Sequence, residues 1–153
     1  GIWNKYYHQF ISVLEVVEPI LETTGVHIIH NLTLETYRSL FSNSNYEVVV
    51  LFSHWHGDTV EFYDGLFHIK EIVEQIPHNY AGIIDLCVCH PNNFGVLIRE
   101  SKPKCLVRFI PHKATPSFLL YFYLVLFSYL EEEDITYLTA LEDVVAEFLK
   151  PKK

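Results

Sequence analysis

The chain has 153 residues, of which 50% are hydrophobic and 15% aromatic, and it carries a formal net charge of −8. This length predicts one domain with a substantial core. The negative charge argues against nucleic acid as a partner, because phosphate binding requires clustered Lys and Arg. The most apolar run, 118–130, is too short to span a bilayer, and the start does not resemble a signal peptide. Since the three cysteines also favour a reducing compartment, we expect a cytoplasmic protein that does not enter a membrane.

The hydrophobic pattern predicts helices that alternate with strands. Residues 1–25 are expected to form a helix that precedes the first strand. Thr33 is a predicted N-cap, and Thr115-Pro116 is expected to begin the most apolar helix. The predicted strands are 26–30, 47–54, 82–89 and 104–110, a hairpin is expected over 58–69, and the further predicted helices are 33–41, 71–76, 92–98, 115–130 and 135–149. This alternation predicts an α/β fold with a parallel sheet in that strand order and helices on both faces.

Chemically active residues follow two of the predicted strands. The stretch 48–57 reads V-V-V-L-F-S-H-W-H-G, and the stretch 83–90 reads I-I-D-L-C-V-C-H. Chemistry in open α/β sheets occurs just beyond the carboxyl ends of the strands, so histidine and thiol are expected at one edge of the sheet. Cys89 lies at the tip of its strand, whereas Cys87 lies one layer deeper and is expected to pack in the core. Cys105 is expected to be structural.

Several longer motifs follow one another in order along the chain. H-I-I-H-N-L-T-L-E-T-Y-R-S-L-F-S and then V-V-V-L-F-S-H resemble the second and third strands of caspases. The long aromatic helix and the motif I-T-Y-L-T-A-L-E-D-V-V-A resemble the bacterial caspase-like branch called CHAT domains. The resemblance covers about residues 26–148. It implies that residues 1–153 form a single domain, a caspase-like three-layer sandwich with a mostly parallel sheet flanked by helices.

The resemblance implies a cysteine endopeptidase that acts on protein or peptide substrates. Cys89 would attack a peptide carbonyl as a thiolate, and a histidine would accept the proton and return it to the leaving amine. We assign this histidine as His56, because in caspase-like sites the glycine that follows, here Gly57, donates an oxyanion N–H. His54 is the alternative base. No cofactor or metal is expected, and a fused regulatory domain or a separate protein is the other partner to be considered.

Two other functions are consistent with the same residues. H-W-H-G-D after an apolar strand resembles the His-x-His-x-Asp-His signature of metallo-β-lactamases, in which His54, His56 and Asp58 would bind zinc. Thr59 stands where that family has its next histidine, which argues against a zinc hydrolase. The other alternative is a caspase-like scaffold without activity, because fold does not determine function. By residue type alone, the candidates for a charge-selective substrate pocket are Arg38, Arg99 and Arg108.

Overall fold

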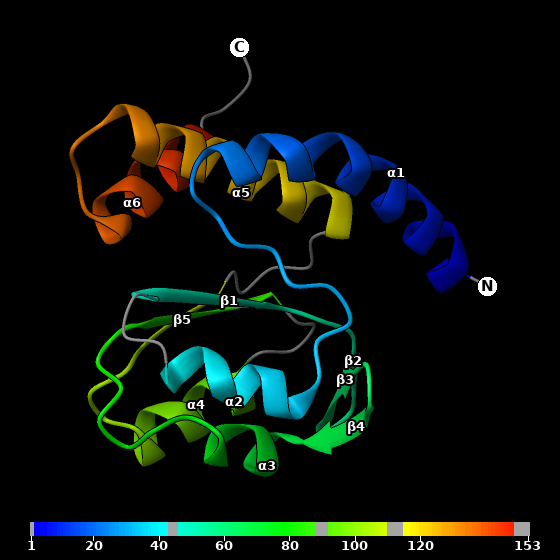
Figure 1. Cartoon of the computed structure of the whole chain (residues 1–153), viewed down its shortest axis with the longest axis vertical. Coiled ribbons are helices and arrows are strands. Elements are labelled where there is room, and N and C mark those ends of the chain that lie inside the picture. Colours follow the sequence, from blue (N-terminus) through cyan, green and yellow to red (C-terminus); the bar gives the residue numbers. More distant parts are fainter. Residues whose placement is uncertain (1, 43–45, 88–91, 110–114, 149–153) are drawn as a thin grey trace. The chain divides into compact units, whose positions relative to one another are not determined.

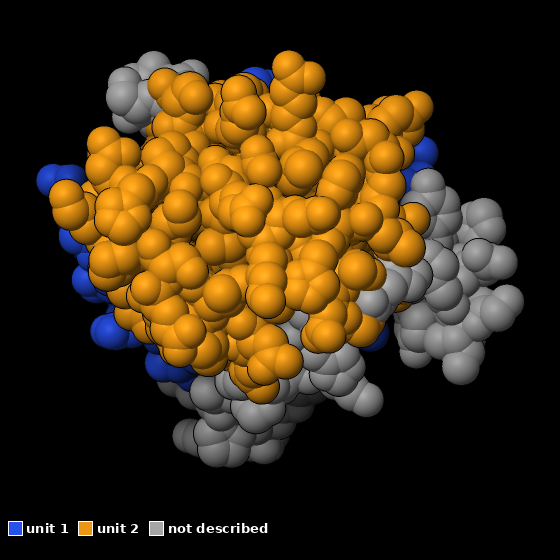
Figure 2. All heavy atoms as spheres, turned by 90° about the horizontal axis from the view of Figure 1, so that it is seen from below, with its two compact units in different colours: residues 1–28, 114–153 blue, residues 29–113 orange. Residues whose placement is uncertain are grey.

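The structure is a computed structural model that describes residues 2–42, 46–87, 92–109 and 115–148. Only the backbone is described at residues 2–9, 55, 56 and 116. The chain divides into two compact units, which Figure 2 colours separately: unit 1 is residues 1–28 with 114–153, and unit 2 is residues 29–113. The mixed α/β class is confirmed, and the assignment of residues 1–153 to a single domain stays a prediction.

Unit 1 is helical. Its helices are α1 (Ile2–Thr23), α5 (Pro116–Glu132) and α6 (Tyr137–Phe148). The start of α5 is the predicted one: the Thr115 hydroxyl accepts a hydrogen bond from the Phe118 N–H at 3.2 Å, and a proline occupies the first turn, where its missing N–H costs nothing. Among the helices that the structure describes, none combines the length and the apolar character needed to cross a bilayer.

The helices of unit 1 pack through aromatic and aliphatic side chains. The predicted N-terminal helix is confirmed by α1, on which Val17 and Leu21 lie one turn apart and are both buried. The rings of Phe118 and Phe122 on α5 lie 5.4 and 5.7 Å from the ring of Phe148 on α6. Such aromatic pairs stabilise the contact beyond the area that they bury.

Unit 2 contains two sheets and three helices among its described residues. Its elements are α2 (Leu34–Ser42), β1 (Val48–Phe52), β2 (Trp55–His56), β3 (Thr59–Phe62), β4 (Gly65–His68), α3 (Ile69–Glu74), β5 (Ile83–Cys87), α4 (Asn92–Ser101) and β6 (Leu106–Phe109). One sheet is parallel, in the order β1-β5-β6, and the other is antiparallel, in the order β2-β3-β4 (Figure 1). The predicted parallel relation of the second and third strands is confirmed, as is the predicted hairpin, here β3–β4.

One predicted strand is wrong. Residues 26–30, all of them described, form no strand, although their composition favours one. Asn31 has a positive φ of 51°, so the chain turns just after this segment. It then enters α2, where the Thr33 hydroxyl accepts a hydrogen bond from the Thr36 N–H at 3.1 Å and confirms the predicted N-cap. A strand exists only where a neighbouring backbone pairs with it, and residues 26–30 have no such pairing with the described residues.

The helices of unit 2 lie on one face of the parallel sheet. Figure 1 shows α2, α3 and α4 together on the same side of β1 and β5. The buried strand residues that pack with these helices alternate along each strand: Val49, Leu51, Ile84, Leu86 and Val107. From the helices, Tyr37, Ile72, Phe94 and Ile98 join the same core and are fully buried. The described helices of unit 2 therefore cover one face of the parallel sheet. The prediction of helices on both faces of the sheet is not confirmed within this unit.

Candidate functional site

The carboxyl ends of β1 and β5 meet, as the strand pattern predicts. The Ser53 N–H donates a hydrogen bond to the Cys87 carbonyl at 3.3 Å, one residue beyond the paired ends of the two strands. Beyond this point the chain leaves the parallel sheet, because the Glu61 N–H donates to the His54 carbonyl at 2.9 Å. The Ser53 hydroxyl also donates to the Glu61 carbonyl. The predicted strand 47–54 therefore ends at Phe52, and residues 53–54 join the two sheets.

His56 and Gly57 lie at the turn of the β2–β3 hairpin. His56 pairs with Thr59, so Gly57 and Asp58 form a two-residue turn. Gly57 has a φ of +68°, a conformation that favours glycine, and a Cβ at this position would meet no atom within 4 Å. The backbone at Gly57 therefore has open space beside it. The sequence pattern predicted the His-Gly pair after a strand but did not predict the separate strand that carries His56.

Of the two cysteines in the predicted third strand, only Cys87 lies in the described residues. Cys87 is buried, as predicted, and is in register with Phe52 of β1. Cys89 lies outside the described residues, and at His56 only the backbone is described. The Cys89–His56 dyad therefore stays a prediction. His54, the alternative base, is half-buried.

The zinc alternative depends on the same segment. Asp58 is exposed on the hairpin turn, and its carbonyl accepts a hydrogen bond from the Ile69 N–H at 3.1 Å. Among the side chains that the structure describes, no three His, Cys, Asp or Glu residues form a group that could hold a metal ion. The His56 side chain is not among them, so a zinc site made of His54, His56 and Asp58 stays a hypothesis.

A buried carboxylate was not predicted. Asp85 is 3% exposed in the central strand β5, and among the described residues it is the one buried charged side chain. It lies two residues before Cys87 on the same face of the sheet, in register with Val50 of β1 and Arg108 of β6. The sequence signal was present, since an acidic residue interrupts the apolar run I-I-D-L-C. Burial of a carboxylate is costly unless other groups compensate its charge.

The three candidate arginines lie on different elements. Arg38 is exposed on α2 and Arg108 on β6. The guanidinium of Arg99 on α4 lies 5.8 Å from the centre of the Phe109 ring. This cation–π contact gives Arg99 a structural role. The structure does not gather these residues into one charge-selective pocket.

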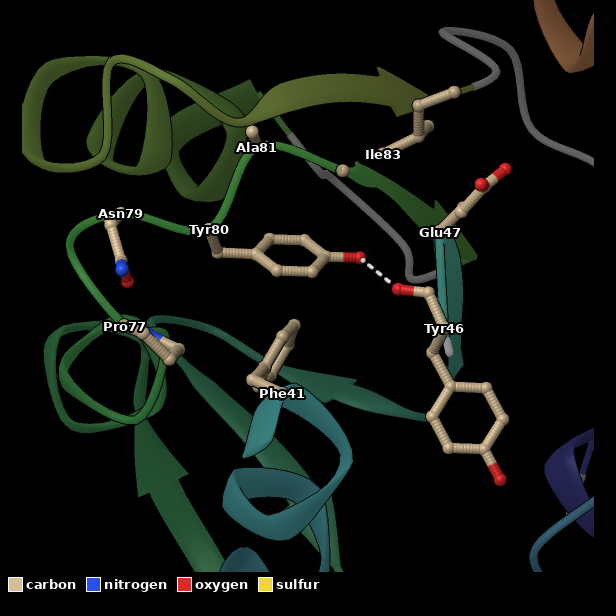
Figure 3. A pocket seen from close by; sticks show the side chains of 9 residues that line it. Phe41, Tyr46, Glu47, Pro77, Asn79, Tyr80, Ala81 and Ile83 are labelled. Carbon is tan, nitrogen blue, oxygen red and sulfur yellow. Dashed lines mark hydrogen bonds between the residues drawn. The ribbon is translucent and has the colours of Figure 1, made fainter. Parts of the chain in front are cut away.

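A pocket of about 570 Å³ lies at the opposite edge, at the amino ends of β1 and β5. Figure 3 shows the Tyr80 ring lying across it, with the hydroxyl directed at the Tyr46 carbonyl, to which it donates at 3.2 Å. Phe41 packs against this ring with the centroids 4.9 Å apart. Burial raises the pKa of Tyr80 to about 12, so its hydroxyl is protonated at neutral pH. Apart from Glu47, the residues that line the pocket are uncharged, and Phe41, Tyr46 and Tyr80 among them are aromatic.

Comparisons of the chain with protein-family models, curated proteins and solved structures found no significant match.

Proposed function

We propose that the chain is a cysteine endopeptidase with a caspase-like sandwich, in which Cys89 is the nucleophile and His56 is the base. The observation that carries the proposal is the hydrogen bond between the Ser53 N–H and the Cys87 carbonyl, which joins the carboxyl ends of β1 and β5. Both proposed reactive residues come shortly after these ends in the chain: Cys89 is two residues after Cys87, and His56 is three residues after Ser53. The parallel order β1-β5-β6, which equals the order of the strands in the chain, supports the caspase-like architecture.

Chain length limits how far the two residues can be from this edge. Two residues span at most about 7 Å, so the Cα atom of Cys89 lies within that distance of the Cα atom of Cys87. Three residues span at most about 10 Å, which sets the corresponding limit between Ser53 and His56. These limits permit a loose substrate-free pair, which tightens in the Michaelis complex.

The proposed reaction needs three groups. The Cys89 thiolate attacks the carbonyl carbon of the scissile peptide, and the C–N bond breaks as His56 donates a proton to the leaving amine. Water then hydrolyses the acyl-enzyme and releases the free cysteine. The Gly57 N–H is the proposed donor to the oxyanion, and the open space beside this glycine supports that role, because a substrate carbonyl can approach the backbone there.

Alkylation by iodoacetamide, followed by mass spectrometry of the folded protein, tests the dyad. A thiol beside a histidine has more thiolate character, so Cys89 should be labelled first. Cys87 and Cys105 should be slow, because both are buried and burial raises the pKa of the Cys105 thiol to about 11. His56→Ala should slow the labelling of Cys89, and the matched control His54→Ala should have less effect.

Two outcomes would contradict the proposal. One is a Cys89 that is not labelled in the folded protein, and the other is a Cys89 that is labelled equally fast in His56→Ala and in the unsubstituted protein. Cleavage of a peptide library that samples each charged residue before the cut supplies the independent readout, and Cys89→Ala should abolish it. A chain that fails both tests is better described as a caspase-like scaffold.

A further inference from the structure

The helix α5 is apolar on all sides, although it is not covered on all sides. From residue 118 to residue 127 its sequence is F-L-L-Y-F-Y-L-V-L-F, which contains no charged residue. Within unit 1 it packs against α1 and α6 (Figure 1). Its buried residues are Leu120, Phe122, Tyr123 and Leu126. A helix that is hydrophobic all round is usually buried all round, so the exposed face of α5 is unusual.

Four large apolar side chains form this exposed face. Phe118, Tyr121 and Val125 follow one another at intervals of three and four residues, so they lie in one line along the helix. Phe148 of α6 adjoins them, because its ring lies 5.4 Å from the ring of Phe118. All four are between 40% and 51% exposed, and we call them the apolar stripe. Contiguous apolar surface with a polar rim is typical of interaction sites.

Acidic residues border the apolar stripe on one side and at one end. The Asp143 carboxylate accepts a hydrogen bond at 2.9 Å from the hydroxyl of Tyr129, which lies one turn after Val125 on α5. Glu147 lies one turn after Asp143, on the same side of α6. Glu132, seven residues after Val125, continues the line of the stripe to the end of α5. These three acidic side chains are exposed, so the stripe has a negative rim.

Few groups of this chain are suited to cover the stripe and its rim. Among the described residues of unit 1, Lys5 is the one Lys or Arg. The end of the chain, L-K-P-K-K over residues 149–153, is basic and lies outside the described residues. Its leucine and proline are too few to cover the four large side chains of the stripe. The apolar groups that fit the stripe therefore come from another molecule.

We propose that the apolar stripe binds an amphipathic helix of a partner protein, which presents large apolar residues flanked by Lys or Arg. The apolar residues cover the stripe, and the cations meet the carboxylates of the rim. A helix fits better than an extended peptide, because the backbone groups of α5 and α6 are already hydrogen-bonded within each helix and offer none for strand addition. From Phe118 to Glu132 the surface is about 21 Å long, which matches about four turns of a partner helix.

The charge of the rim disfavours two other occupants. A second copy of this chain would bring two negative surfaces together, without a described Lys or Arg beside the stripe to compensate them. An anionic membrane would repel the rim, whereas helices that lie on membranes carry Lys and Arg beside their apolar face. The inference does not depend on the proposed peptidase activity, because both residues of the proposed dyad belong to unit 2.

Fluorescence anisotropy with the full chain and a labelled synthetic helix tests the proposal. The probe is a Leu-Lys peptide of about 18 residues, with Leu on one face and Lys on the other, and its control has Glu in place of Lys. The Leu-Lys peptide should bind with a dissociation constant of about 10 μM or lower, and the Leu-Glu peptide should bind at least about a hundredfold more weakly. Equal binding of the two peptides, or no binding of the Leu-Lys peptide at about 1 mM, overturns the proposal.

A matched pair of variants locates the binding surface. Val125→Lys places a cation in the stripe and should raise the dissociation constant of the Leu-Lys peptide at least about tenfold. Leu66→Lys adds the same charge at an exposed apolar residue of β4 in unit 2 and should leave the dissociation constant unchanged. Equal weakening by both variants refutes binding at the stripe.

Nuclear magnetic resonance supplies a test without any substitution. On addition of the Leu-Lys peptide, the amide signals of α5 and α6 should shift, whereas those of β4 should not. Shifts confined to unit 2 overturn the proposal. So does a protein that is dimeric in sedimentation equilibrium and becomes monomeric with Val125→Lys, because a second copy is then the occupant. Binding to phosphatidylserine vesicles that Val125→Lys abolishes assigns the stripe to a membrane and likewise overturns it.

Discussion

Replacement of Tyr37 by phenylalanine should not destabilise the protein and is expected to stabilise it. Tyr37 is fully buried, and its hydroxyl has no hydrogen-bond partner among the described residues. Its ring packs edge-to-face on Phe41 and Phe62, with centroids 5.0 and 5.7 Å away, and phenylalanine keeps both contacts. Burial also raises the pKa of this phenol, as expected for a hydroxyl removed from water.

The magnitude follows from the hydration of that hydroxyl. In the unfolded chain water binds it, and on folding this hydration is lost without replacement, which costs about 1–3 kcal/mol on the scale of protein substitutions. Tyr37→Phe removes this cost, but it also removes the dispersion contacts of one oxygen atom, each worth about 0.1–0.2 kcal/mol. We therefore expect the free energy of unfolding to rise by about 1 kcal/mol.

Tyr80→Phe is the matched control, because it deletes the same atom from a hydroxyl that has a partner. The Tyr80 hydroxyl donates to the Tyr46 carbonyl at 3.2 Å, so its loss should lower the free energy of unfolding by about 1 kcal/mol. Urea denaturation, monitored by circular dichroism, measures both changes as shifts of the unfolding midpoint. The slope m of the unfolding free energy against urea concentration should stay unchanged. If Tyr37→Phe is destabilised as much as Tyr80→Phe, the Tyr37 hydroxyl has a partner in the native state and the reasoning is refuted.

Three further substitutions test the packing of unit 2. Gly82→Ala should cost about 1–3 kcal/mol, because its Cβ would overlap the Tyr80 hydroxyl and lie 2.6 Å from the Glu47 carbonyl oxygen; an unchanged thermal midpoint would show that this close approach is absent. Cys105→Ala should reduce the loss of stability between about pH 9 and pH 11: the thiol pKa rises from 9.0 to about 11 on folding, so in this range the unfolded state releases the proton first and stability falls as pH rises. Urea midpoints that fall equally steeply with and without the thiol would exclude this contribution. Cys87→Ala should lower stability by about 1–2 kcal/mol without loss of the proposed peptidase activity, because the sulfur is buried in the sheet; loss of that activity with an unchanged melting temperature would reverse the proposed roles of the two cysteines.

Local signals in the sequence were sufficient to predict most of the helices and strands. Thr33 and Thr115 begin their helices as predicted, because an N-cap hydroxyl binds an N–H within the same turn and needs no distant partner. The apolar runs of β1 and β5 also predicted a parallel pair, since strands buried on both faces require continuous hydrophobic sequence. These features depend on residues that are close together in the chain.

Only the tertiary structure decided the features that depend on distant residues. Residues 26–30 have the composition of a strand but have no strand pairing, and His56 belongs to β2 because Thr59 pairs with it. The contact of Tyr80 with Tyr46, 34 positions earlier in the chain, likewise has no local signal. Strand pairing and burial depend on which backbones and side chains meet in space, and periodicity cannot specify this. For the same reason the sequence predicts histidine and thiol at one edge of a sheet but does not determine the distance between them.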